Sequence, residues 1–288
     1  MAPRVILITG SSTGFGRALV DAALARGDIA IATLRKPSVL DDLKLQYGPE
    51  RLLVLPLDVT ENDDIGNAFK QARLVYGRVD AVISNAGFSV FAEAEAVPEE
   101  VTRSMFETNV FGSIALARRS VAFFRDENPT PGGHFIVISS VAGVMPNAAM
   151  GVYAATKAAI EAYASSLAQE VASWSIKVTT VTPSLFKTPG IAHAPKLPVH
   201  PAYVEKALPS NFIRHYFSAE SNPEQQWGDD PAKAALAILG LLDKETAPLR
   251  FPLGAEAIGG FKAKAEQLRQ EADEHEAIAT SMVWDDEA

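Results

Sequence analysis

A tyrosine and a lysine lie four residues apart in Tyr153-Ala154-Ala155-Thr156-Lys157, and Ser140 precedes the tyrosine by thirteen residues. Residues four apart share a face of a helix, so the phenol and the ammonium would lie side by side. A neighbouring ammonium favours the phenolate and would lower a pKa that is ordinarily about 10. Tyr153 could then exchange a proton with a carbonyl or alcohol oxygen, while the Ser140 hydroxyl hydrogen-bonds to the same oxygen.

A glycine-rich segment near the amino end is typical of a nucleotide-binding turn. The sequence Thr9-Gly10-Ser11-Ser12-Thr13-Gly14-Phe15-Gly16 follows an apolar run and precedes a helical pattern. Glycines let the backbone turn sharply and approach a pyrophosphate without a Cβ in the way. The N-terminus of the following helix supplies free N–H groups for the phosphates. The spacing G-x-x-x-G-x-G differs from the commonest dinucleotide fingerprint, and a purely structural loop is the alternative.

The residues that end the second apolar run indicate which nicotinamide cofactor binds. In a dinucleotide-binding fold, an acidic residue there binds the ribose hydroxyl of NAD, whereas a basic residue accommodates the 2′-phosphate of NADP. Here Leu34 occupies the acidic position, and the guanidinium of Arg35 can bind a phosphate through two hydrogen bonds. NADP(H) is therefore favoured over NAD(H), unless Arg35 is an ordinary surface charge. Asp58 and Val59, after the third run, are placed to reach the adenine.

Short apolar runs alternate with longer amphipathic stretches, which predicts a doubly wound α/β fold with a parallel, Rossmann-like sheet. Strands are expected at Val5–Thr9, Ile29–Leu34, Leu52–Leu57, Ala81–Ser84, Phe135–Ser139 and Val178–Val181. Helices are expected at Phe15–Arg26, Asp63–Tyr76, Glu99–Phe124, Tyr153–Ala172 and Pro231–Leu242. No linker or repeat divides residues 1–288, so we expect a single domain.

The composition excludes several classes of function. The chain has no cysteine, which excludes disulfides and thiolate chemistry, and its five histidines show no metal-ligand spacing. The net charge of −9 argues against a nucleic-acid surface, because phosphate binding needs clustered Lys and Arg. No apolar run approaches the roughly 20 residues that span a bilayer. We expect a soluble cytoplasmic protein that binds a small molecule and no metal, and a homo-oligomer stays open.

Together these motifs resemble the short-chain dehydrogenase/reductase family over roughly residues 4–190. The residues that carry the resemblance are those of the glycine turn, Asp58, Ser84-Asn85-Ala86-Gly87, Asn109, Ser140, Tyr153 and Lys157. The resemblance implies that Ser140, Tyr153 and Lys157 are catalytic and that Asn109 is a fourth member, which holds a water. It also implies that Lys157 binds the nicotinamide ribose and that Asn85 bridges two strands beside the cofactor.

Two positions depart from the family pattern. The first asparagine of Asn-Asn-Ala-Gly is Ser84 here, and the family's Pro-Gly-x-x-x-Thr is Pro183-Ser184-Leu185-Phe186-Lys187-Thr188. The lost glycine and the bulky Phe186 lie where the family's backbone binds the nicotinamide carboxamide. Because Thr188 is retained, Pro183, Phe186 and Thr188 are still expected at the cofactor. The Thr-Leu-Arg sequence at 33–35 is similar to that of NADP-preferring steroid and carbonyl reductases of the family.

The segment 189–227 is rich in proline and aromatic residues, which predicts a lid over a substrate site. The residues expected to contact the substrate are Phe88, Met145, Phe212 and Tyr216. No cluster of Lys or Arg marks a charged substrate, so a largely apolar ketone is expected. Alternatively, the lid aromatics only pack the loop onto the body. Residues 262–288 are expected to form a polar C-terminal helix or tail.

These inferences predict an NADPH-dependent reductase or dehydrogenase that interconverts a carbonyl and an alcohol by hydride transfer. Two alternatives stay open. A regulatory protein that binds NADP(H) without turnover would keep the fold, although such proteins typically lose the tyrosine or the lysine. An isomerase or cyclase would keep the cofactor and carry out other chemistry.

Overall fold

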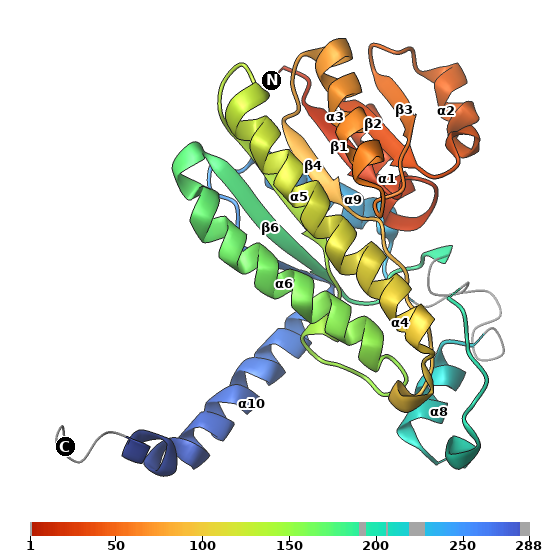
Figure 1. Ribbon diagram of the computed structural model, residues 1–288, viewed down its shortest axis with the longest axis vertical. Helices are drawn as coiled ribbons and strands as arrows, with labels where there is room; N and C mark the ends of the chain where they lie inside the picture. Colours follow the sequence, from red (N-terminus) through yellow and green to blue (C-terminus); the bar gives the residue numbers. More distant parts are fainter. Residues whose placement is uncertain (1, 190–193, 206, 219–227, 283–288) are drawn as a thin grey trace.

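The computed structural model describes residues 2–189, 194–205, 207–218 and 228–282. Within these ranges the chain forms one parallel sheet with helices on both faces (Figure 1). Its strands are β1 (Val5–Thr9), β2 (Ile29–Leu34), β3 (Leu52–Pro56), β4 (Ala81–Ser84), β5 (Gly133–Ile138), β6 (Ile176–Pro183) and β7 (Arg250–Leu253). They are ordered β3-β2-β1-β4-β5-β6-β7, which confirms the predicted doubly wound α/β fold.

Alternate residues of the central strands enter two apolar cores, one on each side of the sheet. Leu7 packs with α3 (Asn62–Tyr76), α5 (Gly112–Ala122) and α6 (Gly151–Val171). Its neighbours Ile6 and Ile8 pack with α1 (Gly14–Ala25) and α9 (Pro231–Gly240). All three side chains are fully buried. Burial on both faces explains why the strands are continuous apolar runs in the sequence.

The parallel register brings several turns to one edge of the sheet. Thr9 lies opposite Thr33, Ile8 opposite Ile83, and Ser84 opposite Val137. The turns that follow β1, β2, β4 and β5 therefore open at the same carboxyl edge. These turns carry the glycine segment, Arg35, Asn85 and Ser140.

Several predicted boundaries are wrong. β3 ends one residue early, β5 begins two residues early and ends before Ser139, and β6 extends beyond the predicted 178–181 on both sides. The sequence does not predict α2 (Asp41–Gln46) or the edge strand β7. The sequence of β7 is Arg-Phe-Pro-Leu, and a proline argues against a strand except at a sheet edge.

The predicted helix Glu99–Phe124 forms with one interruption and ends at Glu127, three residues later than predicted. It consists of α4 (Glu99–Phe106), a π-helical segment Glu107–Phe111, α5, and a second π-helical segment Phe123–Glu127. Asn109 lies in the first π-helical segment. Single π-helical turns inside α-helices occur frequently at functional sites.

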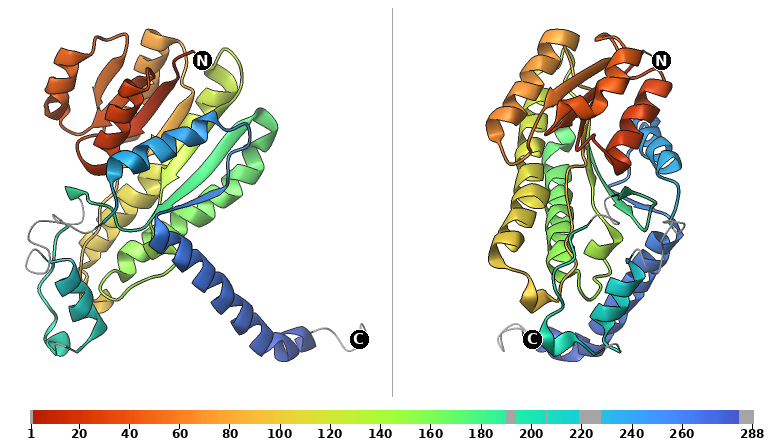
Figure 2. Two further views of the ribbon diagram at one scale, coloured as in Figure 1. Left: turned by 180° about the vertical axis from the view of Figure 1, so that it is seen from behind. Right: turned by 90° about the vertical axis from the view of Figure 1, so that its right-hand side faces the viewer.

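Two helices lie outside the compact body. α8 (Pro209–Tyr216) belongs to the predicted lid segment, of which residues 190–193, 206 and 219–227 lie outside the described residues. α10 (Ala255–Ala279) begins before the predicted residue 262 and projects away from the body (Figure 2). In the described part of the chain, no helix is long and apolar enough to cross a membrane.

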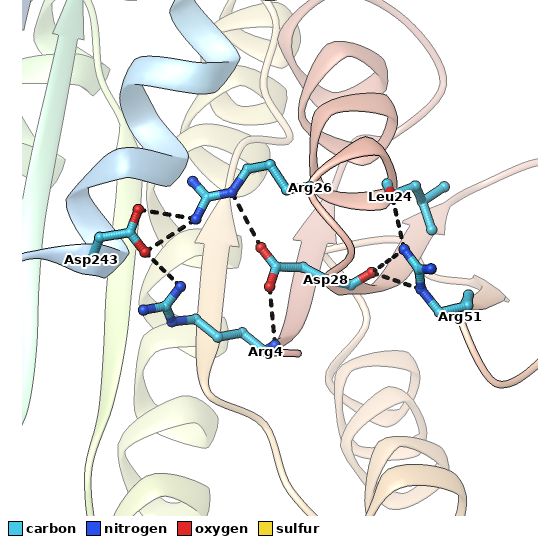
Figure 3. A network of polar contacts seen from close by, with 6 residues as sticks. All are labelled: Arg4, Leu24, Arg26, Asp28, Arg51 and Asp243. Atoms are coloured by element: carbon cyan, nitrogen blue, oxygen red, sulfur yellow. Dashed lines mark hydrogen bonds and ion pairs between the residues drawn. The ribbon is translucent and has the colours of Figure 1, made fainter. Parts of the chain in front are cut away.

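Charged side chains join several elements at the amino edge of the sheet, opposite the functional turns (Figure 3). Asp243, which follows α9, accepts from Arg4 at 2.6 Å and from Arg26 at 3.0 Å. Asp28 accepts from the backbone N–H of Arg4 at 3.1 Å, and its second oxygen lies 3.5 Å from Nε of Arg26. Arg51 donates to the carbonyl of Asp28 at 3.1 Å. This network ties the starts of β1, β2 and β3 to the end of α9.

Candidate active site

A cleft of about 750 Å³ opens at the carboxyl edge of the sheet. Most residues predicted to bind a cofactor line it: Gly10, Ser12, Gly14, Phe15, Leu34, Arg35, Asp58, Val59, Asn85, Ala86, Gly87, Tyr153, Lys157, Pro183, Phe186 and Thr188. Thr9 and Gly16 are not among the lining residues. They are the first and last residues of the glycine turn, and their close contacts determine its shape.

The glycine turn requires glycine at three positions. Gly10 and Gly14 have φ values of 67° and 56°, in the left-handed region that most residues avoid. A Cβ on Gly10 would lie 2.9 Å from the Cα of Ala86, and one on Gly16 would lie 2.1 Å from the carbonyl oxygen of Gly10. The turn therefore packs against the backbone that follows β4. It also leaves the start of α1 open to the cleft, as a bound pyrophosphate would require.

Asn85 connects the turns that follow β1 and β4. Its Nδ2 donates to the carbonyl oxygens of Thr9 at 2.9 Å and Gly10 at 3.2 Å. The hydroxyl of Thr9 accepts from the backbone N–H groups of Asn85 at 3.0 Å and Ala86 at 3.1 Å. These four bonds hold two cofactor-facing turns together, so Asn85 bridges the strands as the family resemblance implies.

Ser140, Tyr153 and Lys157 lie on one wall of the cleft. Nζ of Lys157 lies 5.7 Å from the centroid of the Tyr153 ring and donates to the carbonyl oxygen of Ile138 at 2.8 Å. Ser140 follows β5, and its hydroxyl accepts from the backbone N–H of Ala142 at 3.2 Å. The Ser140 hydroxyl lies close enough to the Tyr153 phenol to lower the pKa of that phenol. The wall thus presents a serine, a phenol and a buried ammonium.

The pKa of Tyr153 is expected to fall through the combined effect of the Lys157 ammonium and an oxidised nicotinamide ring, and the protein's own groups do not produce this fall. Burial raises the pKa of Tyr153, and the hydrogen bond with Ser140 only partly offsets that rise. Lys157 does not reverse the effect, because its ammonium is directed to the carbonyl of Ile138. Burial also lowers the pKa of Lys157 to about 8, against an opposing contribution from the carboxylate of Glu161. Tyr153 is therefore a protonated phenol at neutral pH, as a proton donor must be.

Asn109 is fully buried and does not line the cleft. Its Nδ2 donates to the carbonyl of Phe88 at 2.9 Å and to the hydroxyl of Thr156 at 3.1 Å, and its Oδ1 accepts from Phe88 N–H at 3.0 Å. Both amide hydrogens are thus used by the protein. The side chain positions Phe88 and the helical turn before Lys157, and the water-holding role stays a prediction.

The cleft is also lined by the residues predicted to select NADP over NAD, Leu34 and Arg35. Leu34 is buried, while Arg35 is exposed and lines the cleft. The Oδ1 of Asp58 accepts from the backbone N–H of Thr60 at 3.0 Å and from its hydroxyl at 2.8 Å. Arg35, Asp58 and Lys157 are the charged residues among those that line the cleft. The guanidinium of Arg35 thus lines a cleft that contains few other charged side chains.

The departures at Ser184 and Phe186 are accommodated by contacts specific to this chain. Ser184 bonds to the carbonyl of Leu253 through its N–H at 2.9 Å and its hydroxyl at 3.3 Å. The ring of Phe186 is buried, and its centroid lies 5.1 Å from that of Phe15 in the glycine turn. Asp229 bonds to the backbone on both sides of Phe186. These hydrogen bonds hold the segment after β6 in place. The rings of Phe15 and Phe186 form an apolar pair in the lining of the cleft.

The described part of the predicted lid segment is attached to the loop after β4 by a buried ion pair. The guanidinium of Arg214 donates to both carboxylate oxygens of Glu93, at 2.9 and 2.7 Å, and to the carbonyl of Leu197 at 2.7 Å. Glu93 is 2% exposed and Arg214 is 9% exposed. Burial alone would raise the pKa of Glu93, but the bonds from Arg214 outweigh it and lower the pKa. The sequence does not predict this pair, because its partners are far apart in the chain.

Backbone contacts continue the lid attachment. Phe91 N–H donates to the carbonyl of Pro195 at 3.0 Å, and Leu197 N–H donates to the carbonyl of Phe91 at 3.1 Å. The rings of Phe91 and Phe217 lie 5.1 Å apart. Residues 194–205 and 207–217 are thus docked along the loop that leads from the cleft to α4.

Of the residues predicted to contact substrate, Phe88 alone lines the described cleft. Phe212 and Tyr216 stack at 6.3 Å, are 65% and 39% exposed, and lie outside the cleft lining. Met145 lies against α10, where its Cγ would be 3.2 Å from a Cβ on Gly260. The structure therefore does not bring the four predicted residues together.

Comparisons with known proteins agree with this geometry. The family model described as "short chain dehydrogenase" matches residues 4–196. The oxidoreductase BOA17 of Botryotinia fuckeliana is 30% identical, with 94% of this chain and 96% of the relative covered. The 3-ketodihydrosphingosine reductase of Bacteroides thetaiotaomicron is 33% identical, with 88% and 89% covered. A crystal structure of a short-chain dehydrogenase from Streptomyces avermitilis is 35% identical, with 99% and 100% covered and a TM-score of 0.84.

The chain therefore belongs to the short-chain dehydrogenase family. It is an oxidoreductase that acts on carbonyl or alcohol groups, and its family binds nicotinamide cofactors. Among the described residues, no group of three or more His, Asp or Glu is arranged to hold a metal ion.

Proposed function

We propose that this protein is an NADPH-dependent reductase that converts a largely apolar ketone or aldehyde into an alcohol, and catalyses the reverse reaction. The observation that carries the proposal is the joint position of Ser140, Tyr153 and Lys157 on the wall of a cleft that also contains the glycine turn and Arg35. Proton-donating groups and a dinucleotide-sized groove thus share one edge of the sheet.

The residues present fit a nicotinamide dinucleotide. The tight contacts of Gly10 and Gly16 leave no room for side chains in the turn, as close approach of a pyrophosphate demands. When bound, the reduced nicotinamide supplies a hydride to the carbonyl carbon. The phenol of Tyr153 gives its proton to the carbonyl oxygen, and the hydroxyl of Ser140 hydrogen-bonds to the same oxygen. The ammonium of Lys157 then stabilises the phenolate that Tyr153 becomes.

The preference for NADP(H) rests on Leu34 and Arg35. A carboxylate at position 34 would repel a 2′-phosphate, and the exposed guanidinium of Arg35 can bind one through two hydrogen bonds. Direct measurement of Kd for NADPH and NADH tests this preference. The wild type should bind NADPH more tightly, and Leu34→Asp should reverse the order. Equal affinity of the wild type for both cofactors would contradict the role of Arg35.

The apolar substrate class follows from the charges of the cleft. Arg35 and Asp58 stand at the cofactor-selecting end, which leaves Lys157 as the charged lining residue beside Tyr153. A substrate phosphate or carboxylate would have no further cation among the described lining residues. The relative from Bacteroides thetaiotaomicron, named a 3-ketodihydrosphingosine reductase, supports the same class. The lid segment 189–227 would exclude water from the site.

A panel of ketones and aldehydes of increasing size, assayed for NADPH oxidation with identification of the product, tests the reaction. Consumption of NADPH in equal amount to the alcohol formed supports a reductase. Binding of NADPH without turnover on any carbonyl would favour a regulatory protein. Product formation without net NADPH consumption would favour an isomerase or cyclase.

A further inference from the structure

The terminal helix α10 leaves the body of the molecule after its first turns. Ala257 is fully buried, and Gly260, Phe261 and Lys264 are partly buried. Every residue from 265 to 282 is exposed. At 1.5 Å per residue, the exposed helical part from 265 to 279 extends about 22 Å. Figures 1 and 2 show this part projecting beyond the sheet and its covering helices.

The root of α10 lies against the loop that follows Ser140. A Cβ on Gly260 would lie 3.2 Å from Cγ of Met145 and 3.2 Å from Cγ2 of Val141. Gly260 therefore allows the helix to approach this loop closely. The helix is anchored beside the cleft and directed away from it.

An apolar stripe runs along the whole helix. Its members recur at alternate spacings of three and four residues: Ile258, Phe261, Ala265, Leu268, Ala272, His275, Ala279 and Met282. His275 is the one polar member, and its Nδ1 contacts the carbonyl oxygen of Glu271 in the preceding turn at 2.8 Å. This heptad spacing is the pattern of a helix that packs against another helix. The body partly covers the stripe at Phe261, but Leu268 is 52% exposed and Met282 is 74% exposed. The stripe thus continues a covered face into solvent.

The charges that flank the stripe change sign along the helix. Lys262, Lys264 and Arg269 flank its first half, whereas Glu271 and Glu276 flank its second half. Arg269 also forms ion pairs with Glu266 and Asp273 of its own helix, so Lys262 and Lys264 carry most of the basic character. In a parallel pair of such helices, Lys264 would face Arg269 and Glu271 would face Glu276, which sets like charges together. In an antiparallel pair, the basic half of each helix lies beside the acidic half of the other. The helix is therefore complementary to a reversed copy of itself.

Three alanines favour the same arrangement. Ala265, Ala272 and Ala279 recur every seven residues on the stripe. The distance between packed helices depends on the side chains at the contact, so alanines permit a close approach. The larger Leu268 and Met282 can then pack into the spaces beside the opposite helix.

We propose that α10 pairs in antiparallel orientation with α10 of a second copy of this chain and forms a two-fold symmetric dimer. The pairing buries the stripe and places each basic half beside an acidic half. It also brings the end of the second copy's helix toward the root of α10, beside the loop that follows Ser140. The proposal does not depend on the catalytic function proposed above.

Sedimentation velocity of the full chain over a range of concentrations tests the proposal. Leu268→Glu combined with Ala272→Glu places two charges on the stripe and should raise the dimer dissociation constant by at least about tenfold. The matched control, Gln270→Glu combined with Ala277→Glu, adds the same charge to the outer face and should associate like the wild type. An unchanged far-UV circular dichroism spectrum and an unchanged urea denaturation midpoint verify that the variants fold.

Charge exchange tests the orientation. Lys262→Glu with Lys264→Glu should weaken the dimer, as should Glu271→Lys with Glu276→Lys. All four substitutions together should largely restore it, because four of the five flanking charges then exchange their signs and only Arg269 is unchanged. A wild type that is monomeric at all concentrations, stripe variants with the mass of the wild type, or no recovery in the fourfold variant would each overturn the proposal.

Discussion

The turns that line the cleft and the predicted lid segment are held in place by different kinds of contact. The cofactor side means the turns in the cleft lining, and the lid side means the described residues of 194–217, none of which lines the cleft. On the cofactor side, backbone turns pack directly on one another, and the side chain of Asn85 joins two of them. On the lid side, residues 194–205 and 207–217 contain no strand of the main sheet, and the Glu93–Arg214 pair attaches them to the body together with two backbone hydrogen bonds of Phe91. The cofactor side depends on the absence of side chains at glycines, whereas the lid side depends on a buried ion pair and a few backbone bonds.

This difference suggests how binding is divided between the two sides. The cofactor side is part of the sheet and leaves little freedom for change, as a cofactor common to many reactions requires. Under the proposed function, the lid side contacts the substrate, so its aromatic residues can vary with the substrate while Ser140, Tyr153 and Lys157 stay in place. Substitutions on the two sides should therefore separate cofactor binding from substrate selection.

Tyr153 lines the cleft, and its replacement should have the largest effect on turnover. Tyr153→Phe keeps the ring and its packing but removes the proton. We expect kcat to fall about 10²–10⁴-fold, the usual contribution of general acid catalysis, while Kd for NADPH stays within about twofold of the wild type. Retention of most of the wild-type kcat would show that another group supplies the proton.

Arg214→Met should affect the lid side alone. It leaves the carboxylate of Glu93 buried without its partner, and breaking a buried ion pair typically costs about 3–5 kcal/mol. We expect the lid to detach locally, which raises KM for bulky ketones and leaves Kd for NADPH unchanged. Steady-state kinetics with a large and a small ketone measure the effect.

The double variant Glu93→Leu with Arg214→Met is the control for this substitution. Replacing both charges with apolar groups is often close to neutral, so docking and KM should recover in part. If the single variant instead weakens NADPH binding as much as ketone binding, the cofactor side and the lid side are not independent.

The pH dependence should report the buried ammonium of Lys157. Its pKa of about 8 means that the charge is present below pH 8 and lost above it. We expect kcat/KM for reduction to fall as the pH rises through about 8, since this parameter follows the free enzyme. Glu161→Gln removes the carboxylate that raises the pKa of Lys157, so the midpoint should move to lower pH.

Glu170→Gln is the matched control on the same helix, because this carboxylate is exposed. It should leave the midpoint where the wild type has it. If Glu161→Gln leaves the pH dependence of kcat/KM unchanged, Lys157 does not control the decrease in kcat/KM at high pH.

The smallest effect is expected at the opposite edge of the sheet. Asp243→Asn removes the partner of Arg4 and Arg26, whose side chains are 21% and 23% exposed. Partly exposed ion pairs contribute about 0–1 kcal/mol, so urea denaturation should show a small loss in the free energy of unfolding. Kinetic parameters should not change. If Asp243→Asn lowers the free energy of unfolding as much as Arg214→Met does, burial does not explain the difference between the Asp243 network and the Glu93–Arg214 pair.

The sequence is most informative where local residue types determine structure. The glycine turn requires glycine for steric reasons, and the Tyr153–Lys157 spacing places both residues on one helix face, so both are visible in the sequence alone. The apolar runs also identify six of the seven strands. The seventh, β7, is short and contains a proline, so its pairing with β6 determines its conformation.

Features that depend on distant contacts could not be predicted. Glu93 and Arg214 are 121 residues apart, and no periodicity relates them. The direction of the pKa of Tyr153 depends on its burial and on the carbonyl that binds Lys157, which only the folded chain defines. The predicted substrate contacts of Phe212 and Tyr216 rest on residue type alone, and the structure places both outside the cleft lining.

The central claim, direct hydride transfer between NADPH and a carbonyl carbon, is tested most directly with NADPH deuterated at C4 of the nicotinamide. Each of the two C4 hydrogens is labelled in a separate preparation, and the wild type is incubated with an apolar ketone that it reduces. The preparation labelled at the transferred hydrogen should give one deuterium on the carbinol carbon for each NADPH consumed. Tyr153→Phe should bind the same cofactor and form little labelled alcohol. An alcohol that carries no deuterium from either face, or a product formed without NADPH consumption, would contradict the account.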